Sequence, residues 1–167
     1  RAGVAHAKLR YSVPPPADAD VVVADMYPFD ADLQFATDRG LWPLLSAQRG
    51  ASRVILAACP RGVGHHSLYP VQNAFVSRVL RRLSRLRLRD LRRPLEKVRN
   101  AAKLLTQGNV PGLALAPGVS DAELATVFKR ASRFSEWHGL RAALELRHSS
   151  AGVKVAVYRC APLLLPT

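Results

Sequence analysis

Residues 52–69 read SRVILAACPRGVGHHSLY, and this stretch decides the fold. Its first half contains the apolar run Val54–Ala58, which ends at Cys59 and Pro60. A wholly apolar run of this length between turn residues predicts a strand covered on both faces, as in a parallel sheet. The second half is a loop with two glycines and two histidines. It follows the carboxyl end of the strand, where open α/β sheets bind ligands.

Similar apolar runs recur along the chain and alternate with helical patterns. Strands are predicted at 19–25, 53–58, 112–116 and 153–158. Helices are predicted at 1–10, from Asp30 or Asp32 to about 47, in two apolar stripes between 67 and 108, from the capping box at Ser120 to about 134, and at 136–147 behind Ser135. This alternation predicts a three-layer α/β fold, a mostly parallel, Rossmann-like sheet with helices on both faces, as a single domain over 1–167.

The positive charge of the chain is concentrated in one segment. The formal net charge is +13, and residues 75–105 alone carry 11 Lys/Arg against 2 Asp/Glu. Their arginines alternate with leucines rather than aromatic residues, so base stacking is not indicated. Either a solvated helix face or a surface for an anionic partner explains this pattern. Arg78 and Arg82, four residues apart, repel each other, which favours an anionic partner or an acidic domain nearby.

The remaining composition limits the cellular location. No apolar run approaches the roughly 20 residues that span a bilayer, and the first residues lack the order of a secretion signal. The two cysteines, Cys59 and Cys160, are too few for a disulfide framework. We therefore expect a cytoplasmic protein with reduced thiols and no membrane partner.

The loop after the second predicted strand invites two chemical readings. Cys59, His65 and His66 lack a second Cys/His pair at zinc-like spacing, so we expect no metal site made by this chain alone. Gly62 and Gly64 do not complete a dinucleotide fingerprint, because its third glycine is replaced by Ser67. An anion at the start of the next helix and a simple tight turn both remain open.

Three stretches resemble the nickel-pincer-dependent lactate racemase family. ADVVVADMYPFDADLQFATDRGL (19–41) resembles its strand, Tyr-Pro-x-Asp turn and helix. VILAACPRGVGHHSLYP (54–70) resembles its next strand and Cys-x-x-Gly-x-Gly-His loop, and GVKVAVYRCAPLLLP (152–166) resembles its final strand. The order agrees over nearly the whole chain, but with the second, C-terminal domain of that family only.

The resemblance implies a two-domain racemase or epimerase with a nickel-pincer nucleotide between the domains. Such enzymes reversibly remove hydride from a 2-hydroxy acid. The lysine that tethers the cofactor and the histidines that ligate nickel or act as bases belong to the N-terminal catalytic domain. We expect that domain to lie outside this chain, so no catalytic or metal-ligating residue is carried over. The matching, cleft-facing candidates are Tyr27, Asp30, Cys59, Gly62, Gly64 and His65.

The helix after the Tyr-Pro turn departs from the family pattern. The family has Tyr-Gln-x-x-Lys there, but in this chain its glutamine falls on Phe35 and its lysine on Asp38. A one-residue slip instead offers Gln34 and Arg39, which we include as substrate-binding candidates. They are five apart and do not share a helix face in the family's way. Asp38 would repel a substrate carboxylate that a basic group would bind.

Two functions follow as expectations. The first is the C-terminal domain of a lactate-racemase-like isomerase, inactive alone, that faces a small 2-hydroxy acid or related anion across a cleft shared with its N-terminal domain. The second is a non-enzymatic basic α/β module that binds nucleic acid or an acidic partner through its Arg-rich helices. Loss of binding with added salt would favour the second.

Overall fold

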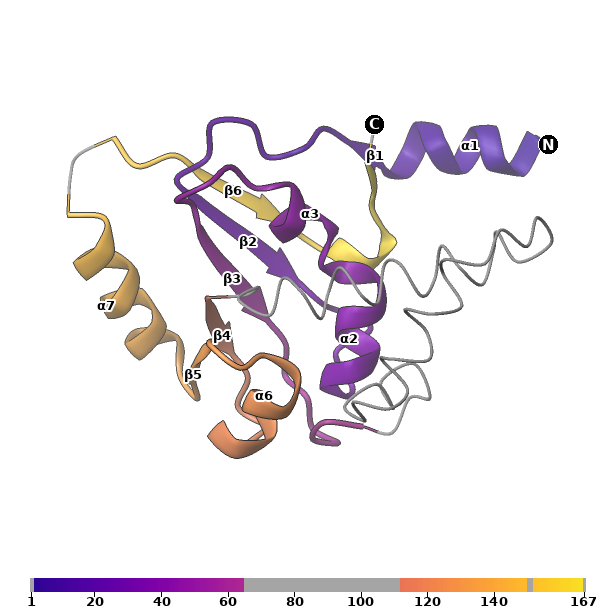
Figure 1. Ribbon diagram of the computed structural model, residues 1–167. Helices are drawn as coiled ribbons and strands as arrows, with labels where there is room; N and C mark the ends of the chain where they lie inside the picture. The colour runs from indigo at the N-terminus through magenta and orange to yellow at the C-terminus, as the bar shows by residue number, and fades with distance from the viewer. Residues whose placement is uncertain (1, 65–111, 150–151, 167) are drawn as a thin grey trace, which may run out of the picture. The chain divides into compact units, whose positions relative to one another are not determined.

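Five parallel strands form the central sheet of the computed structural model, which describes residues 2–64, 112–149 and 152–166 (Figure 1). The strands are β2 (Val21–Asp25), β3 (Ser52–Leu56), β4 (Leu113–Leu115), β5 (Ser132–Phe134) and β6 (Val155–Tyr158). Their order across the sheet is β5-β4-β3-β2-β6, with every neighbouring pair parallel. The predicted α/β class and parallel sheet are confirmed.

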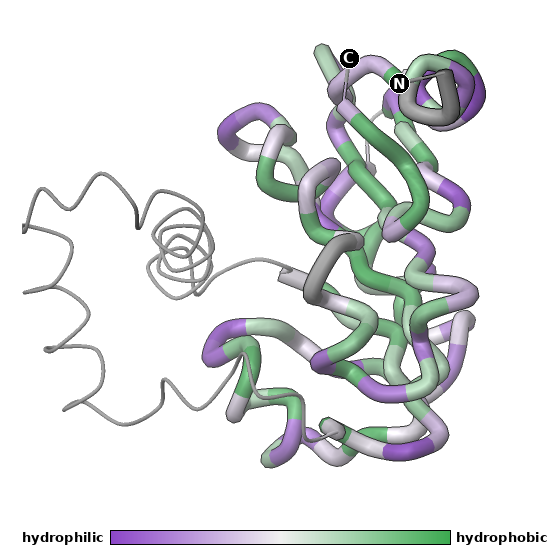
Figure 2. Tube along the Cα trace, turned by 90° about the vertical axis from the view of Figure 1, so that its right-hand side faces the viewer, coloured by the Kyte–Doolittle hydropathy of each residue, from purple (hydrophilic) through white to green (hydrophobic). Residues whose placement is uncertain are grey.

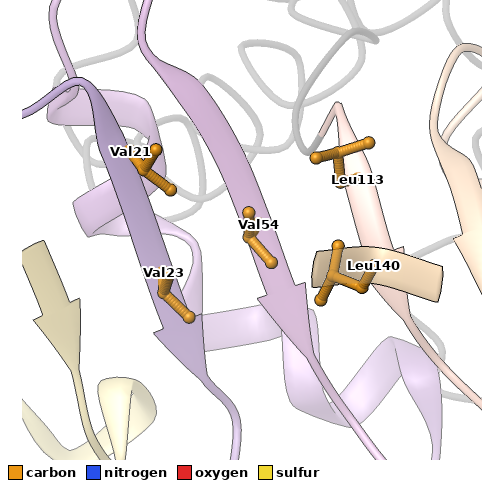
Figure 3. Close-up of a cluster of buried hydrophobic side chains, with 5 residues drawn as sticks. All are labelled: Val21, Val23, Val54, Leu113 and Leu140. Atoms are coloured by element: carbon orange, nitrogen blue, oxygen red, sulfur yellow. The ribbon is translucent and has the colours of Figure 1, made fainter. Parts of the chain in front are cut away.

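One face of the sheet is covered by helix α7 (Trp137–Arg147). Figure 3 shows Leu140 of this helix beside Val21, Val23, Val54 and Leu113 of three adjacent strands. These five side chains form a buried cluster, because alternate residues of a strand point to the same face. The cluster fixes α7, and therefore the residues at its end, against the sheet.

The opposite face is covered by α2 (Leu33–Gly40) and α3 (Trp42–Ser46), which connect β2 to β3 (Figure 1). Val22 and Ile55 point to this side and are fully buried, as is Leu44 of α3. Along the tube of Figure 2, the central strands are accordingly among the more hydrophobic stretches. Helices on both faces confirm the three-layer prediction for the described residues.

Two predicted helices were wrong in their extent. The helix expected up to about residue 47 ends at Gly40, and a second one begins at Trp42, because Pro43 suits a first helical turn and not a helix interior. The helix expected to about 134 is α6 (Asp121–Val127), and the chain then forms β5. β5 was missed because SRF is a three-residue edge strand without an apolar run.

Two of the three helix caps expected in the described residues have the predicted chemistry. Asp32 accepts a hydrogen bond from the backbone N–H of Phe35 at 2.8 Å and starts α2, whereas Asp30 does not cap it. Ser120 and Glu123 form the complete capping box of α6, and their hydrogen bonds lower the pKa of Glu123. Ser135 does not cap α7, whose first flanking residue is Glu136.

The two ends of the described chain meet in a second, two-stranded parallel sheet. Helix α1 (Ala2–Tyr11) leads into β1 (Ser12–Val13), which pairs with β7 (Leu165–Pro166) after the short helix η3 (Ala161–Leu163). Tyr158 anchors this region by donating its hydroxyl to the carbonyl of Pro14 at 2.9 Å. Residues 1–64 and 109–167 form one compact unit. None of the described helices is long and apolar enough to cross a membrane.

Candidate functional site

The turn after β2 and the Gly-rich loop after β3 are joined by backbone hydrogen bonds. Neighbouring parallel strands end at the same edge of the sheet, so residues 26–34 run beside residues 57–64. Four backbone bonds of 2.8–3.0 Å connect them: Cys59 N–H to Asp30, Arg61 N–H to Ala31, Leu33 N–H to Gly62, and Gln34 N–H to Val63. The two motif segments therefore form one folded unit at the carboxyl edge, the side where the strands end.

The acidic residues of this unit hold backbone groups. The carboxylate of Asp30 accepts from the N–H of Ala58 at 3.1 Å, and that of Asp25 accepts from the N–H of Tyr27 at 3.1 Å. Asp32 is buried and starts α2. Asp25, Asp30 and Asp32 therefore stabilise the turn that follows β2. Asp30, a cleft-facing candidate, is half-buried and serves as a cross-link between the turn and the loop.

Cys59 lies under the loop and is fully buried. Burial, followed by the negative charges of Asp30 and Asp32, raises the pKa of its thiol to about 12. A buried thiol with this pKa stays protonated at neutral pH, so it is a poor nucleophile. Its position, expected to face a cleft, therefore contributes packing. Cys59 and Cys160 are both free thiols.

The other matching residues of the turn and loop are more accessible. Tyr27 is 62% exposed at the carboxyl end of β2, next to a cis peptide bond to Pro28. Gly62 is half-buried beside α6, and a Cβ there would lie 3.6 Å from the carboxylate of Glu123. Gly64 has a φ of +81°, and a Cβ would overlap the side chain of Asp32, so this position requires glycine. His65 lies outside the described residues.

The helix after the turn places Gln34, Phe35 and Arg39 in α2. Phe35 packs on Phe29 with ring centroids 5.0 Å apart, so it is a packing residue. The side-chain oxygen of Gln34 is buried and has no hydrogen-bond partner within the described residues. An amide oxygen in this state is costly unless some donor reaches it. Among the described side chains of this helix, Gln34 has a buried polar atom that is left unsatisfied.

The topological switch point of the sheet lies between β2 and β6, because the chain continues from β2 toward β5 and then returns to the other side of β2. Side chains of the protein fill the space at the carboxyl ends of β2 and β6, where a ligand would otherwise bind. Met26 and Ala161 are fully buried there, and a Cβ on Gly40 would clash with Met26 and Pro162. Tyr27, which follows the end of β2 and is exposed, therefore remains accessible at this edge.

The donor set of the described residues does not fit a metal centre. No group of three His, Cys, Asp or Glu side chains comes together among them. Cys59 is fully buried, and Asp25, Asp30 and Asp32 accept hydrogen bonds from backbone N–H groups. The part of the chain that the structure describes thus does not itself fit a nickel group, and no chemical step is assigned to one here.

A second feature, which the sequence patterns did not reveal, lies at the amino edge of the sheet, where the strands begin. A cavity of about 310 Å³ opens there. Its lining residues are Gly50, Ala51, Ser52, Arg53, Gly112, Arg147 and His148. They come from three distant parts of the sequence, which is why no local motif marks them.

A scan of the sequence against protein-family models finds no match, and a search of curated proteins finds none either. The functional interpretation therefore depends on the motifs and on the geometry of the described residues.

Proposed function

We propose that this chain is the C-terminal domain of a lactate-racemase-like isomerase, a 2-hydroxy acid racemase or epimerase with a nickel-pincer cofactor, and that it is inactive alone. One observation carries the proposal. The two motif segments, the Tyr-Pro-x-Asp turn and the Cys-x-x-Gly-x-Gly loop, lie side by side at the carboxyl edge of a parallel sheet and are joined by backbone hydrogen bonds. Ligands of open α/β sheets bind at this edge.

The residues available for a substrate are Tyr27 and Gln34. The exposed phenol of Tyr27 can donate a hydrogen bond to a carboxylate. The amide oxygen of Gln34 is buried and unsatisfied within the described residues, so it could accept a hydrogen bond from a 2-hydroxyl group only if the side chain turned outward. Asp30, Asp32 and Gly64 shape the surface from which Tyr27 projects. In this proposal the chain binds and orients a small anion, and the cleft is completed by an N-terminal domain.

The cofactor of the proposed enzyme belongs to the complete two-domain protein. When bound, it supplies a hydride acceptor for the carbon that carries the substrate hydroxyl. The lysine and histidines of the first domain would hold it. The two free cysteines favour a reducing compartment, so we place the protein in the cytoplasm.

The test uses the product of the complete gene. Nickel content would be measured by mass spectrometry, and racemisation of D- or L-lactate and of longer 2-hydroxy acids by chiral chromatography. We expect about one nickel per chain, and a Tyr27→Phe variant with at least roughly tenfold lower kcat/KM because a charge-assisted hydrogen bond is lost. Tyr11→Phe, a matched change on α1, should leave kcat/KM unchanged. A nickel-free product without racemase activity would contradict the proposal.

The basic segment 75–105 supports a second candidate, the binding of nucleic acid or an acidic partner. It carries +9 of the net charge of +13 and lies outside the described residues. Binding through it would weaken steeply with added salt. Neutral substitutions at Arg81, Arg85 and Arg92 would weaken it further, whereas Tyr27→Phe would not. Binding that ignores salt and these arginines would exclude this candidate.

A further inference from the structure

The cavity at the amino edge is walled by basic and hydroxyl groups. Arg53, Arg147 and His148 line it together with Ser52, and among the described residues no carboxylate belongs to its lining. The remaining wall is made of two glycines and one alanine, which leave backbone exposed to a ligand. A hollow with this lining favours an oxyanion over a cation or an apolar group.

Arg53 supplies a positive charge that is already fixed in place. Its Nε donates to the carbonyl of Leu44 at 2.9 Å, and its Nη2 donates to the carbonyls of Ala47 and Gln48 at 3.1 and 3.3 Å. These bonds tie the end of α3 to β3 and hold the guanidinium rigidly. Nη1 takes part in none of these bonds and can donate to a ligand. Because the side chain is already ordered, binding of a ligand does not need to immobilise it.

Arg147 supplies a positive charge that meets no carboxylate among the described residues. It is exposed at the last turn of α7 and forms no ion pair within the part of the chain that the structure describes. Its Nη1 lies 3.9 Å from where a Cβ of Gly112 would be, so the guanidinium extends over the start of β4. The negative end of the α7 dipole favours a cation at this position, but does not occupy its five donors.

His148 and Ser52 complete the polar wall. The Nε2 of His148 and the Oγ of Ser52 are 2.8 Å apart, and Ser52 is 91% buried. This pair links the residue after α7 to the first residue of β3, so the two sides of the cavity have a defined spacing. If the ring N–H on Nε2 donates to the serine oxygen, the hydroxyl proton of Ser52 is free to donate to an anion.

We propose that this cavity binds the phosphate group of a small phosphorylated molecule. The guanidinium of Arg147 can match two phosphate oxygens in a bidentate way, while Nη1 of Arg53 and the hydroxyl of Ser52 add single donors for the remaining oxygens. About 310 Å³ holds a phosphate together with a small organic group attached to it. The site lies at the opposite edge of the sheet from Tyr27, so the proposal is independent of the proposed function.

Calorimetric titration of the full 167-residue chain with inorganic phosphate, at low ionic strength, tests this inference. We expect saturable binding at one site, and at least roughly tenfold weaker binding for Arg147→Gln because a charge-assisted contact is lost. Ser52→Ala should weaken binding by a smaller factor. Arg159→Gln is the matched control, since it removes the same charge from an exposed position after the carboxyl end of β6.

Three outcomes would overturn the proposal. The first is no saturable binding of phosphate at concentrations up to about ten millimolar, because we expect the dissociation constant of this site to lie well below that concentration. The second is an equal loss in Arg147→Gln and Arg159→Gln, because this would show only the effect of net charge. The third is equally tight binding of acetate, which would assign the cavity to carboxylates. Circular dichroism of each variant checks that it is folded.

Discussion

The two edges of the central sheet are built in opposite ways. At the carboxyl edge, the turn after β2 and the loop after β3 consume each other's hydrogen bonds, three aspartates hold backbone N–H groups, and Cys59 is fully buried. At the amino edge, the beginnings of β3 and β4 and the end of α7 surround a hollow of about 310 Å³. The carboxyl edge carries negative charge that is engaged by backbone N–H groups, whereas the amino edge carries positive charge that no carboxylate of the described residues neutralises.

A sequence motif at the carboxyl edge of a parallel sheet is therefore not sufficient evidence of a complete binding site. The carboxyl edge presents an exposed tyrosine on a rigid surface, which suits one wall of a cleft that a second domain completes. The amino edge has its donors on three sides and needs no further domain. We expect substitutions and labelling to distinguish the carboxyl edge from the amino edge.

The largest effect concerns thiol reactivity at the carboxyl edge. Because the pKa of Cys59 is raised from 9.0 to about 12, its thiolate fraction at pH 8 falls roughly a thousandfold, and burial slows labelling further. We expect iodoacetamide to label the partly exposed Cys160 and to spare Cys59, as measured by peptide mass spectrometry. Equal labelling of both would show that the edge opens.

The same pKa shift predicts how stability changes with pH. The folded state favours the protonated thiol, so this contribution is complete below pH 9.0 and is lost as the pH rises toward about 12. Urea titrations of the wild type and Cys59→Ala should therefore converge over this alkaline range. A constant difference between them would argue against a buried, protonated thiol.

Alanine at the two ends of β4 compares the edges directly. A Cβ on Gly118 would overlap the carbonyl of Cys59, so Gly118→Ala should cost about 3 kcal/mol in unfolding free energy. A Cβ on Gly112 meets only ordinary contacts at 3.9 Å, so Gly112→Ala should stay within about 0.5 kcal/mol of the wild type. Urea denaturation measures both, and equal costs would remove the contrast.

Removal of a helix cap tests the internal satisfaction of the carboxyl edge. Asp32→Ala should cost about 1–2 kcal/mol, because the buried N–H of Phe35 loses its acceptor. Asp121→Ala breaks an exposed ion pair with Arg133 and should cost less than about 1 kcal/mol. Thermal unfolding of both variants checks the order, and a smaller cost at Asp32 would contradict it.

Of the three test substitutions Gly118→Ala, Asp32→Ala and Ser52→Ala, the smallest effect is expected for Ser52→Ala at the amino edge. Ser52→Ala removes the hydroxyl beside His148 and should cost about 1 kcal/mol, since water in the open cavity can replace the lost partner. Ser46→Ala, at an exposed position at the end of α3, should be nearly neutral. A cost at Ser52 above that at Gly118 would reverse the comparison of the two edges.

Much of the fold could be predicted from the sequence, because its signals are local. Branched apolar runs located four of the five sheet strands, and the Ser120–Glu123 box and Asp32 located two helix starts. β5 was missed because its residues have no apolar run, and the break at Trp42 because helical periodicity continues through it. Predicted strands also began one or two residues early or ended late, as with β3 at Ser52–Leu56.

The candidate sites were less predictable, because they depend on contacts between distant segments. The motif identified Tyr27 and Gly64, but only the folded turn and loop reveal that Asp30 and Cys59 are engaged in structure. The amino-edge cavity joins residues near 52, 112 and 147, and no spacing in the sequence brings these together. Burial and parallel register create both edges, and neither is encoded in a short pattern.

The most direct measurement of this contrast is a two-dimensional amide NMR titration of the chain with inorganic phosphate. We expect saturable chemical-shift changes at the amides of Ser52, Gly112 and His148, and unchanged chemical shifts at the amides of Tyr27 and Gly62. Shifts centred on the turn at 26–30 and the loop at 58–64, with none at the amino edge, would contradict it.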